Sequence, residues 1–181
     1  MDERRAAKVW FIGAGPGAED LITVRGARLI GEADVVVWAR SLVSAEILEY
    51  AREDAEVIES SDIPLEGVRA VYERAVREGL RVARVHSGDP SVYGAVMEQI
   101  EACEKVGLEW EMVPGVSSFS AAAAAVGREL TVPEVAQSVI LTRRASRTPM
   151  PAGEDIKSFA RHGTTMAIFL SAAKPRELED D

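Results

Sequence analysis

Short apolar runs alternate with longer amphipathic stretches over the first 127 residues of the chain. The runs KVWFIG at 8–13 and DVVVWA at 34–39 are almost continuously apolar, which is typical of strands buried on both faces. By contrast, PLEGVRAVYERAVREG at 64–79 repeats its apolar residues at helical spacing and closes on a glycine. This alternation predicts an α/β fold whose mostly parallel sheet is covered by helices.

The same patterns place the remaining elements of this region. Further strands are expected at 81–86 and 109–113, and further helices at 18–33, 44–52, 92–107 and 117–127. In the first of these helices, one face is expected to carry the apolar residues Leu21, Val24, Leu29 and Ile30.

The pattern changes after Gly127. The stretch 128–137 reads as a linker, and two strands at 138–143 and 164–172 then enclose a short helix at 155–163. Two strands and one helix bury too little surface to be stable alone. We therefore expect an N-terminal α/β domain at 1–128 and, at 129–181, the start of a second α/β domain that is incomplete in this chain.

Three glycine-containing loops follow predicted strands and lead into predicted helices: GAGPGA at 13–18, HSGDPSVYG at 86–94 and VPGVSSFS at 113–120. In an open α/β sheet, the carboxyl ends of the strands form the ligand crevice. The three loops are therefore expected to meet at one edge of the sheet. Asp89 with Ser117 and Ser118 suits a ligand that bears a positive charge, or ribose hydroxyls and an amine.

The first loop also fits the letters of a dinucleotide fingerprint through Gly13, Gly15 and Ala18. Pro16 weakens this interpretation, because a proline removes an amide that would face a phosphate, and two acidic residues follow it. Arg40 stands where a ribose-binding acid would lie, and an arginine there suits a 2′-phosphate. An NADP-dependent oxidoreductase therefore remains an alternative, as does a tight turn without a ligand.

Three segments together resemble the tetrapyrrole methylase family: FIGAGPGAEDLITVRGARLI, HSGDPSVYGA and VPGVSSFSAAAAAVGRELTVPEVAQSVILTR. The likeness extends from Val9 to about Ala172. Members use S-adenosylmethionine to methylate tetrapyrroles, and WARSLVS and GDPSVYGA resemble those acting on C11 of precorrin-4 or cobalt-precorrin-4 in cobalamin biosynthesis. The resemblance implies two α/β domains with the cofactor in the cleft between them. A C20 or uroporphyrinogen methylase and a non-catalytic binding module remain alternatives.

The resemblance also implies roles for individual residues. The positions that match cofactor contacts are Pro16, Ser87, Gly88, Asp89, Val92, Ser117, Ser118 and Leu170. The first loop, with Gly13, Gly15 and Gly17, matches the floor of the substrate trough. Because precorrins carry many carboxylates, a local basic patch is needed, and the candidates to supply it are Arg40 with Ser41, and Arg143, Arg144 and Arg147.

The chemistry implied by the family needs neither a metal nor a nucleophilic side chain. The sulfonium of S-adenosylmethionine already activates the methyl group, so catalysis consists mainly of positioning and exclusion of water. If a proton leaves the substrate after transfer, His86 and Glu134 are the candidate acceptors. The sequence identifies no catalytic residue beyond these candidates, and it does not tell whether the substrate carries cobalt.

Composition narrows the setting. The 181-residue chain has a net charge of −9, which argues against a general nucleic-acid-binding protein. Cys103 is the single cysteine, so no disulfide forms within the chain. No apolar run has membrane-spanning length and the start lacks the pattern of a signal peptide. We expect a cytoplasmic protein that binds a small tetrapyrrole and forms a homodimer.

Overall fold

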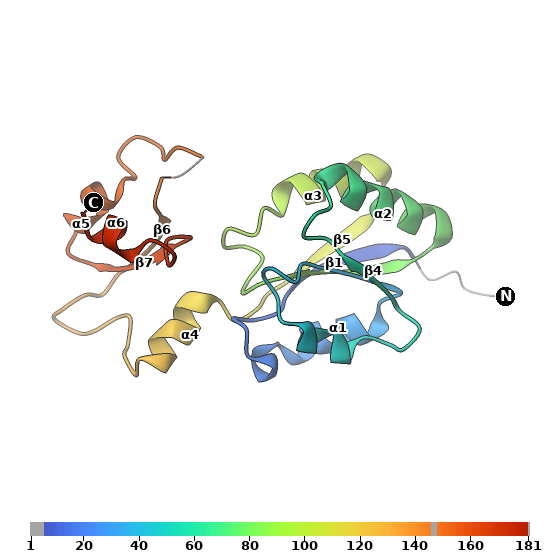
Figure 1. The fold of residues 1–181 in the computed structure, drawn as a ribbon, viewed down its shortest axis with the longest axis horizontal. Helices are drawn as coiled ribbons and strands as arrows, with labels where there is room; N and C mark the ends of the chain where they lie inside the picture. The colour runs from blue at the N-terminus through green and yellow to red at the C-terminus, as the bar shows by residue number, and fades with distance from the viewer. Residues whose placement is uncertain (1–5, 146–147, 181) are drawn as a thin grey trace. The chain divides into compact units, whose positions relative to one another are not determined.

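A computed structural model describes residues 6–145 and 148–180 (Figure 1). The chain divides into two compact units, Met1–Ala121 and Ala122–Asp181, and each is described by itself. None of the helices in the described ranges is long and apolar enough to cross a membrane.

The first unit is built on a five-stranded sheet in which every pairing is parallel. Its strands follow the spatial order β3-β2-β4-β1-β5. This confirms the predicted α/β fold with a mostly parallel sheet. The strand bounds are β1 Lys8–Gly13, β2 Val35–Trp38, β3 Glu56–Glu59, β4 Arg81–His86 and β5 Glu109–Val113. The sequence pattern missed β3, because this four-residue edge strand carries two glutamates and is not buried.

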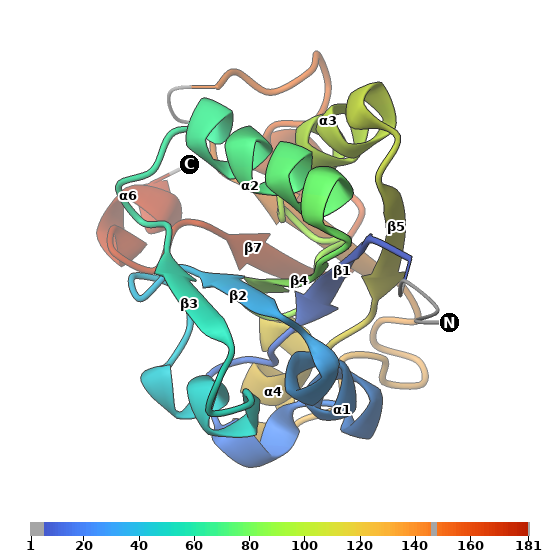
Figure 2. The same ribbon diagram turned by 90° about the vertical axis from the view of Figure 1, so that its right-hand side faces the viewer.

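Helices cover both faces of this sheet (Figure 2). Successive residues of β1 alternate between two apolar cores, because side chains of a strand point to opposite faces. Phe11 packs on the side of α2 Leu65–Glu78 and α3 Met97–Val106, whereas Ile12 packs on the side of α1 Val24–Glu32.

Two predicted helix starts were wrong. The segment 18–33 forms a 3₁₀ turn at Glu19–Leu21, and α1 begins only at Val24, where the Thr23 hydroxyl accepts a hydrogen bond from the Gly26 N–H at 3.0 Å. Leu21 and Val24 are consequently exposed, and the core-facing residues of α1 are Leu29 and Ile30.

The helix predicted at 92–107 begins at Met97, because Tyr93 and Ala95 adopt positive φ values that interrupt a helix. The segment predicted as a helix at 44–52 forms a 3₁₀ helix at Ala45–Tyr50. The ends of α2 and α3 agree with the prediction, since Gly79 and Gly107 close them in the left-handed conformation.

The second unit contains one parallel pair of strands, β6 Val139–Arg143 and β7 Thr165–Phe169. The helices of this part of the chain are α4 Ser118–Ala125, which spans the division between the units, α5 Ile156–Ala160 and α6 Pro175–Asp180. The pattern did not predict α6, because its residues are almost all polar. No apolar side chain among the described residues of 122–180 is buried, in line with the small surface that two strands and short helices cover.

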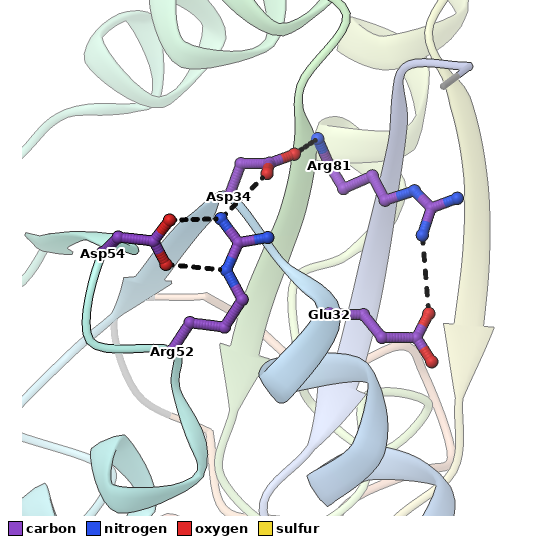
Figure 3. A network of polar contacts seen from close by, with 5 residues as sticks. All are labelled: Glu32, Asp34, Arg52, Asp54 and Arg81. Carbon is purple, nitrogen blue, oxygen red and sulfur yellow. Dashed lines mark hydrogen bonds and ion pairs between the residues drawn. The ribbon is translucent and has the colours of Figure 1, made fainter. Parts of the chain in front are cut away.

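A polar network connects the amino ends of β2 and β4 (Figure 3). These ends lie opposite the carboxyl ends of the strands, from which the glycine loops start. Asp34 accepts a hydrogen bond from the Arg81 backbone N–H at 2.8 Å and pairs with Arg52 at 3.2 Å. Arg52 also pairs with Asp54, and the Arg81 side chain reaches Glu32 at 3.5 Å. These contacts help to set how β4 lies against β2, which in turn positions the loops at the carboxyl ends.

Candidate cofactor and substrate site

The three glycine loops follow three neighbouring strands, because β1 lies between β4 and β5. We call residues 13–18 the first loop, 87–92 the second and 114–118 the third. The first two are joined by a pair of backbone hydrogen bonds, from the Gly88 N–H to the Gly15 carbonyl at 2.7 Å and from the Gly15 N–H to the Gly88 carbonyl at 3.2 Å. The predicted meeting of these loops at one sheet edge is confirmed.

Bare backbone forms the contact among the loops. A Cβ atom at Gly13 would lie 2.6 Å from the Gly88 carbonyl oxygen and 2.7 Å from the Gly115 Cα. A Cβ atom at Gly115 would lie 2.2 Å from that same oxygen. No residue other than glycine fits either position without moving backbone. The glycines are therefore required by this close approach, a requirement different from that of a phosphate-binding turn.

Asp89 links the second loop to the third. One carboxylate oxygen, Oδ2, accepts a hydrogen bond from the Gly115 N–H at 2.9 Å. The other, Oδ1, accepts from the Ser91 N–H at 2.8 Å and from the Ser91 hydroxyl. Partial burial opposes ionisation of the carboxyl, but these hydrogen bonds outweigh it and lower the pKa of Asp89. The loops thus hold a carboxylate that is ionised at neutral pH.

The other candidate cofactor residues of the first unit lie on these loops. Ser87 is exposed, and Pro16 and Val92 are half-buried. Ser117 is buried before α4 and its carbonyl accepts from the Ser120 N–H, whereas Ser118 is exposed at the first residue of the helix. The structure thus brings the first-unit candidates, which are distant in sequence, together at a single rim.

The remaining candidates belong to the second unit. Leu170 directly follows β7, is 80% exposed and has a φ of 57°. Glu134 is exposed with a φ of 62°. A largely exposed leucine in the left-handed region costs stability. This unfavourable conformation keeps Leu170 a candidate for contact with a ligand.

Arg143 and Arg144 line a hollow of about 270 Å³ together with Lys157 and Asp155. Both arginines already have partners within the chain. The Arg143 guanidinium donates to the carbonyl oxygens of Arg144, Thr148 and Pro149 at 3.1–3.2 Å. Arg144 pairs with Glu177. Arg147, the third arginine expected in this patch, lies outside the described residues.

Arg40 and Ser41 follow β2 with exposed side chains. Their backbone is held by the end of β3 and the loop after it, because the Arg40 N–H donates to the Glu59 carboxylate at 3.1 Å and the Ser41 N–H donates to the Ser61 hydroxyl at 3.4 Å. The segment 42–47, which directly follows Arg40 and Ser41, shares a hollow with the first loop. Its lining comprises Ala14, Gly15, Gly17, Ala18, Glu19, Leu42, Val43, Ser44 and Ile47. The predicted trough floor and the segment that carries Arg40 are therefore neighbours.

His86 lies at the end of β4, immediately before the second loop, and is 8% exposed. Its Nε2 atom has no hydrogen-bond partner among the described residues. Burial, reinforced by the nearby Arg84 charge, lowers the pKa of His86 to about 3. The imidazole is consequently neutral near pH 7 and a weak base, which argues against a role as proton acceptor.

Sequence reasoning missed Arg84, which lies on the same face of β4 as His86. Its half-buried guanidinium donates to Gln99 at 3.0 Å and to the Ser60 hydroxyl at 2.9 Å. Gln99 also accepts from the buried Tyr72 hydroxyl at 3.0 Å. No carboxylate within the described part of the chain pairs with Arg84, and burial lowers its pKa. The available signal was an arginine in the interior of the predicted strand, between the buried Ala83 and Val85.

The buried state of His86 predicts a pH effect on stability. Because the folded-state pKa lies below that of the unfolded chain, protonation favours unfolding, and stability is lost as pH falls from about 6.5 towards 3. The variant His86→Gln should flatten this part of the profile, where the slope contributed by one histidine is about 1.4 kcal/mol per pH unit.

Urea denaturation at several pH values measures this effect. His162→Gln is the matched control, because His162 is exposed and the chain has two histidines. Equal pH profiles for the wild type and His86→Gln would contradict the assignment of a neutral, buried imidazole.

A parallel sheet with three glycine loops at one rim agrees with the comparison with known families. The model of the tetrapyrrole (corrin/porphyrin) methylases matches residues 8–181, so the chain belongs to this family. The dinucleotide interpretation fails on geometry, since α1 starts at Val24 and not at the first loop, as that fingerprint requires. No group of three or more His, Cys, Asp or Glu within the described ranges is arranged to hold a metal ion.

Similar proteins point to one subgroup. The chain is 49% identical over 173 residues to a cobalt-precorrin-4 C(11)-methyltransferase of Methanocaldococcus jannaschii, covering 96% of this chain and 66% of that protein. It is 50% identical over 165 residues to a precorrin-4 C(11)-methyltransferase of Pseudomonas aeruginosa, covering 91% of this chain and 66% of the relative. The chain thus spans about two thirds of the length of these curated relatives.

Solved structures of methyltransferases that act on tetrapyrroles also match this chain. The X-ray structure of a cobalt precorrin-4 methyltransferase, described as a cobalamin biosynthetic enzyme, matches with a TM-score of 0.92 and 45% identity, covering 96% of this chain and 73% of that one. A uroporphyrin-III C-methyltransferase of Thermus thermophilus, complexed with S-adenosyl homocysteine, matches with a TM-score of 0.75 and 26% identity, covering 96% and 70% of the two chains.

Proposed function

We propose that this protein catalyses S-adenosylmethionine-dependent C-methylation of precorrin-4 or cobalt-precorrin-4 at C11, in cobalamin biosynthesis. The observation that carries the proposal is the rim of three glycine loops around Gly13, Gly88 and Gly115, in a chain about half identical to methyltransferases of that name. Other methylases of the family, of the C20 or uroporphyrinogen type, remain the alternative.

The cofactor is proposed to be S-adenosylmethionine, with S-adenosylhomocysteine as product. The loops fit such a ligand, because the ionised Asp89 carboxylate favours a nearby cation and the exposed hydroxyls of Ser87 and Ser118 suit ribose or an amino acid group. When bound, the cofactor supplies a methyl group activated by its sulfonium. The proposed contact residues are Pro16, Ser87, Gly88, Asp89, Val92, Ser117 and Ser118 of the rim, together with Leu170.

The residues of this chain act mainly by holding and shielding the reactants. The loops lie in close backbone contact at Gly13, Gly88 and Gly115, and holding the reactants in position lowers the entropic part of a bimolecular barrier. Glu134 remains a proposed proton acceptor. The neutral His86 imidazole is a poor one.

The substrate carboxylates are proposed to be held, in the first unit, by Arg40 with Ser41 beside the floor formed by Gly13, Gly15 and Gly17. In the second unit, the proposed carboxylate contacts are Arg143 and Arg144. Arg40 is the best supported of these, because its side chain is exposed while its backbone is fixed by Glu59. Within the second unit, Lys157 increases the positive charge of the hollow that Arg143 and Arg144 line.

This assignment makes a kinetic prediction. Arg40→Ala should raise the substrate KM about five-fold and leave the affinity for S-adenosylhomocysteine unchanged, because a charge-assisted contact contributes roughly 1 kcal/mol at an exposed site. Arg69→Ala, in an exposed i,i+4 pair on α2, is the control. An equal loss of cofactor affinity in Arg40→Ala would show that Arg40 supports the loops instead of the substrate.

Two measurements test the proposed function. Isothermal calorimetry compares S-adenosylhomocysteine with NADPH, and binding of the first alone is expected; binding of NADPH alone would favour an oxidoreductase. Incubation with precorrin-4 and labelled cofactor, followed by mass spectrometry and NMR of the product, locates the new methyl group. A methyl group at C20, or transfer to uroporphyrinogen instead, would assign the protein to another branch of the family.

We also propose that the protein is a cytoplasmic homodimer. The single, buried cysteine suits a reducing compartment. Exposed apolar side chains in the segment 126–135, Val126 at 69% and Val135 at 74%, favour contact with another chain. Light scattering after size-exclusion chromatography measures the mass in solution, and a monomer at micromolar concentration would contradict the dimer.

A further inference from the structure

The second and third loops are held to each other differently from the first and second. The first and second share two backbone hydrogen bonds between Gly15 and Gly88. The second and third follow β4 and β5, which are separated by β1 and do not pair. Among the described residues, one hydrogen bond joins these two loops, from the Gly115 N–H to Asp89 Oδ2 at 2.9 Å.

Glycine backbones meet where the second and third loops approach each other. A Cβ atom at Gly115 would lie 2.2 Å from the Gly88 carbonyl oxygen. Glycine has no side chain to interlock with its neighbour and allows more backbone conformations than other residues. The Asp89 carboxylate therefore provides the directional contact that keeps the third loop over the end of β1.

The carboxylate is also largely occupied within the chain. An ionised carboxylate offers about four acceptor sites, and Asp89 accepts three hydrogen bonds, two from Ser91 and one from Gly115. Both of its oxygens thus face the loops themselves, which leaves little capacity for a ligand.

We propose that Asp89 is a positioning residue: it clamps the second loop to the third and thereby sets the spacing between the two halves of the rim that receive the cofactor. This inference rests on the proposed function and revises the role of Asp89 from direct ligand contact to organiser of the loops. Ser91 supports it by orienting the carboxylate through Oδ1, so that Oδ2 faces Gly115.

Affinity measurements with ligands that each lack one chemical group distinguish a clamp from a direct contact. The affinity of the wild type and Asp89→Ala is measured for S-adenosylhomocysteine, for 5′-methylthioadenosine, which lacks the amino acid part, and for the 2′-deoxy and 3′-deoxy forms of S-adenosylhomocysteine. A clamp acts on the whole rim, so the loss should be about ten-fold for every ligand. A loss that disappears when one chemical group is missing would show direct contact with that group and overturn the proposal.

A second measurement needs no ligand. Amide hydrogen exchange at Gly115 in the free protein should become at least ten-fold faster in Asp89→Ala, because the N–H loses its acceptor. Ser91→Ala is the matched control, since it removes only the hydroxyl contact to Oδ1, while the Ser91 N–H still orients the carboxylate so that Oδ2 faces Gly115. Unchanged exchange at Gly115 in a folded Asp89→Ala protein would refute the clamp. If exchange responds while the wild type binds no S-adenosylhomocysteine, the clamp stands and the proposed function fails.

Discussion

Gly115→Ala is expected to weaken the binding of S-adenosylhomocysteine by at least a hundred-fold. The added methyl group would lie 2.2 Å from the Gly88 carbonyl oxygen and 2.7 Å from the Gly13 Cα. Both obstacles are backbone atoms, so no side-chain rotation relieves the overlap. One of the loops must therefore move. Overpacking against backbone costs about 3 kcal/mol at the upper end of the usual range, and about 2.7 kcal/mol corresponds to a hundred-fold loss of affinity.

Calorimetry with S-adenosylhomocysteine measures the effect, and tryptophan fluorescence verifies that the variant is folded. Gly107→Ala is the control, because a Cβ atom there meets nothing within 4 Å and the change carries only the strain of a φ of 70°. That strain costs about 1–2 kcal/mol of stability without reaching the rim. If Gly115→Ala binds the ligand as well as Gly107→Ala does, the three-loop rim is not the cofactor site.

Tyr72→Ala is expected to lower the free energy of unfolding of the first unit by about 3–5 kcal/mol, the usual cost of deleting a buried aromatic ring. Tyr72 lies on α2 and is fully buried. Its ring packs edge-on against Phe11 of β1, with the ring centroids 6.5 Å apart, and its hydroxyl donates to Gln99 of α3. The substitution thus removes packing between the sheet and both helices of that face.

Tryptophan fluorescence during urea denaturation is a specific probe for this effect, because all three tryptophans, Trp10, Trp38 and Trp110, lie in the first unit. Tyr72→Phe is the control, since it retains the ring and removes the hydrogen bond to Gln99, at a cost of about 1–2 kcal/mol. A similar small loss in Tyr72→Ala and Tyr72→Phe would mean that the ring contributes little to this core.

The strands of the first unit were predictable wherever burial on both faces imposes a continuous apolar run. Residues 8–13 and 35–38 are such runs, and both are strands of the parallel sheet. The pattern failed at β3, a four-residue edge strand with two glutamates, and at the starts of α1 and α3. There the start depends on the Thr23 cap and on positive φ values at Tyr93 and Ala95, which apolar periodicity does not encode.

The candidate site was also predictable only in part from the sequence. The sequence indicated that three glycine loops follow three strands, and the rule for parallel sheets was sufficient to predict that they meet. It also predicted the family, since the motifs are local in the chain. It did not predict that Gly13 and Gly115 are needed for contact between backbones, because the atoms that meet are about 100 residues apart.

The sequence by itself therefore determined the parallel α/β architecture, the loops at its carboxyl edge and the membership of the tetrapyrrole methylases, since each depends on local patterns of residues. Only the tertiary structure decided which partner each polar side chain has. It directs Asp89 to Gly115, engages Arg143 with carbonyl oxygens and buries His86 until its imidazole is neutral. Hydrogen-bond partners and burial are set by chain segments distant in sequence, and they decide whether a polar residue is left to bind a ligand.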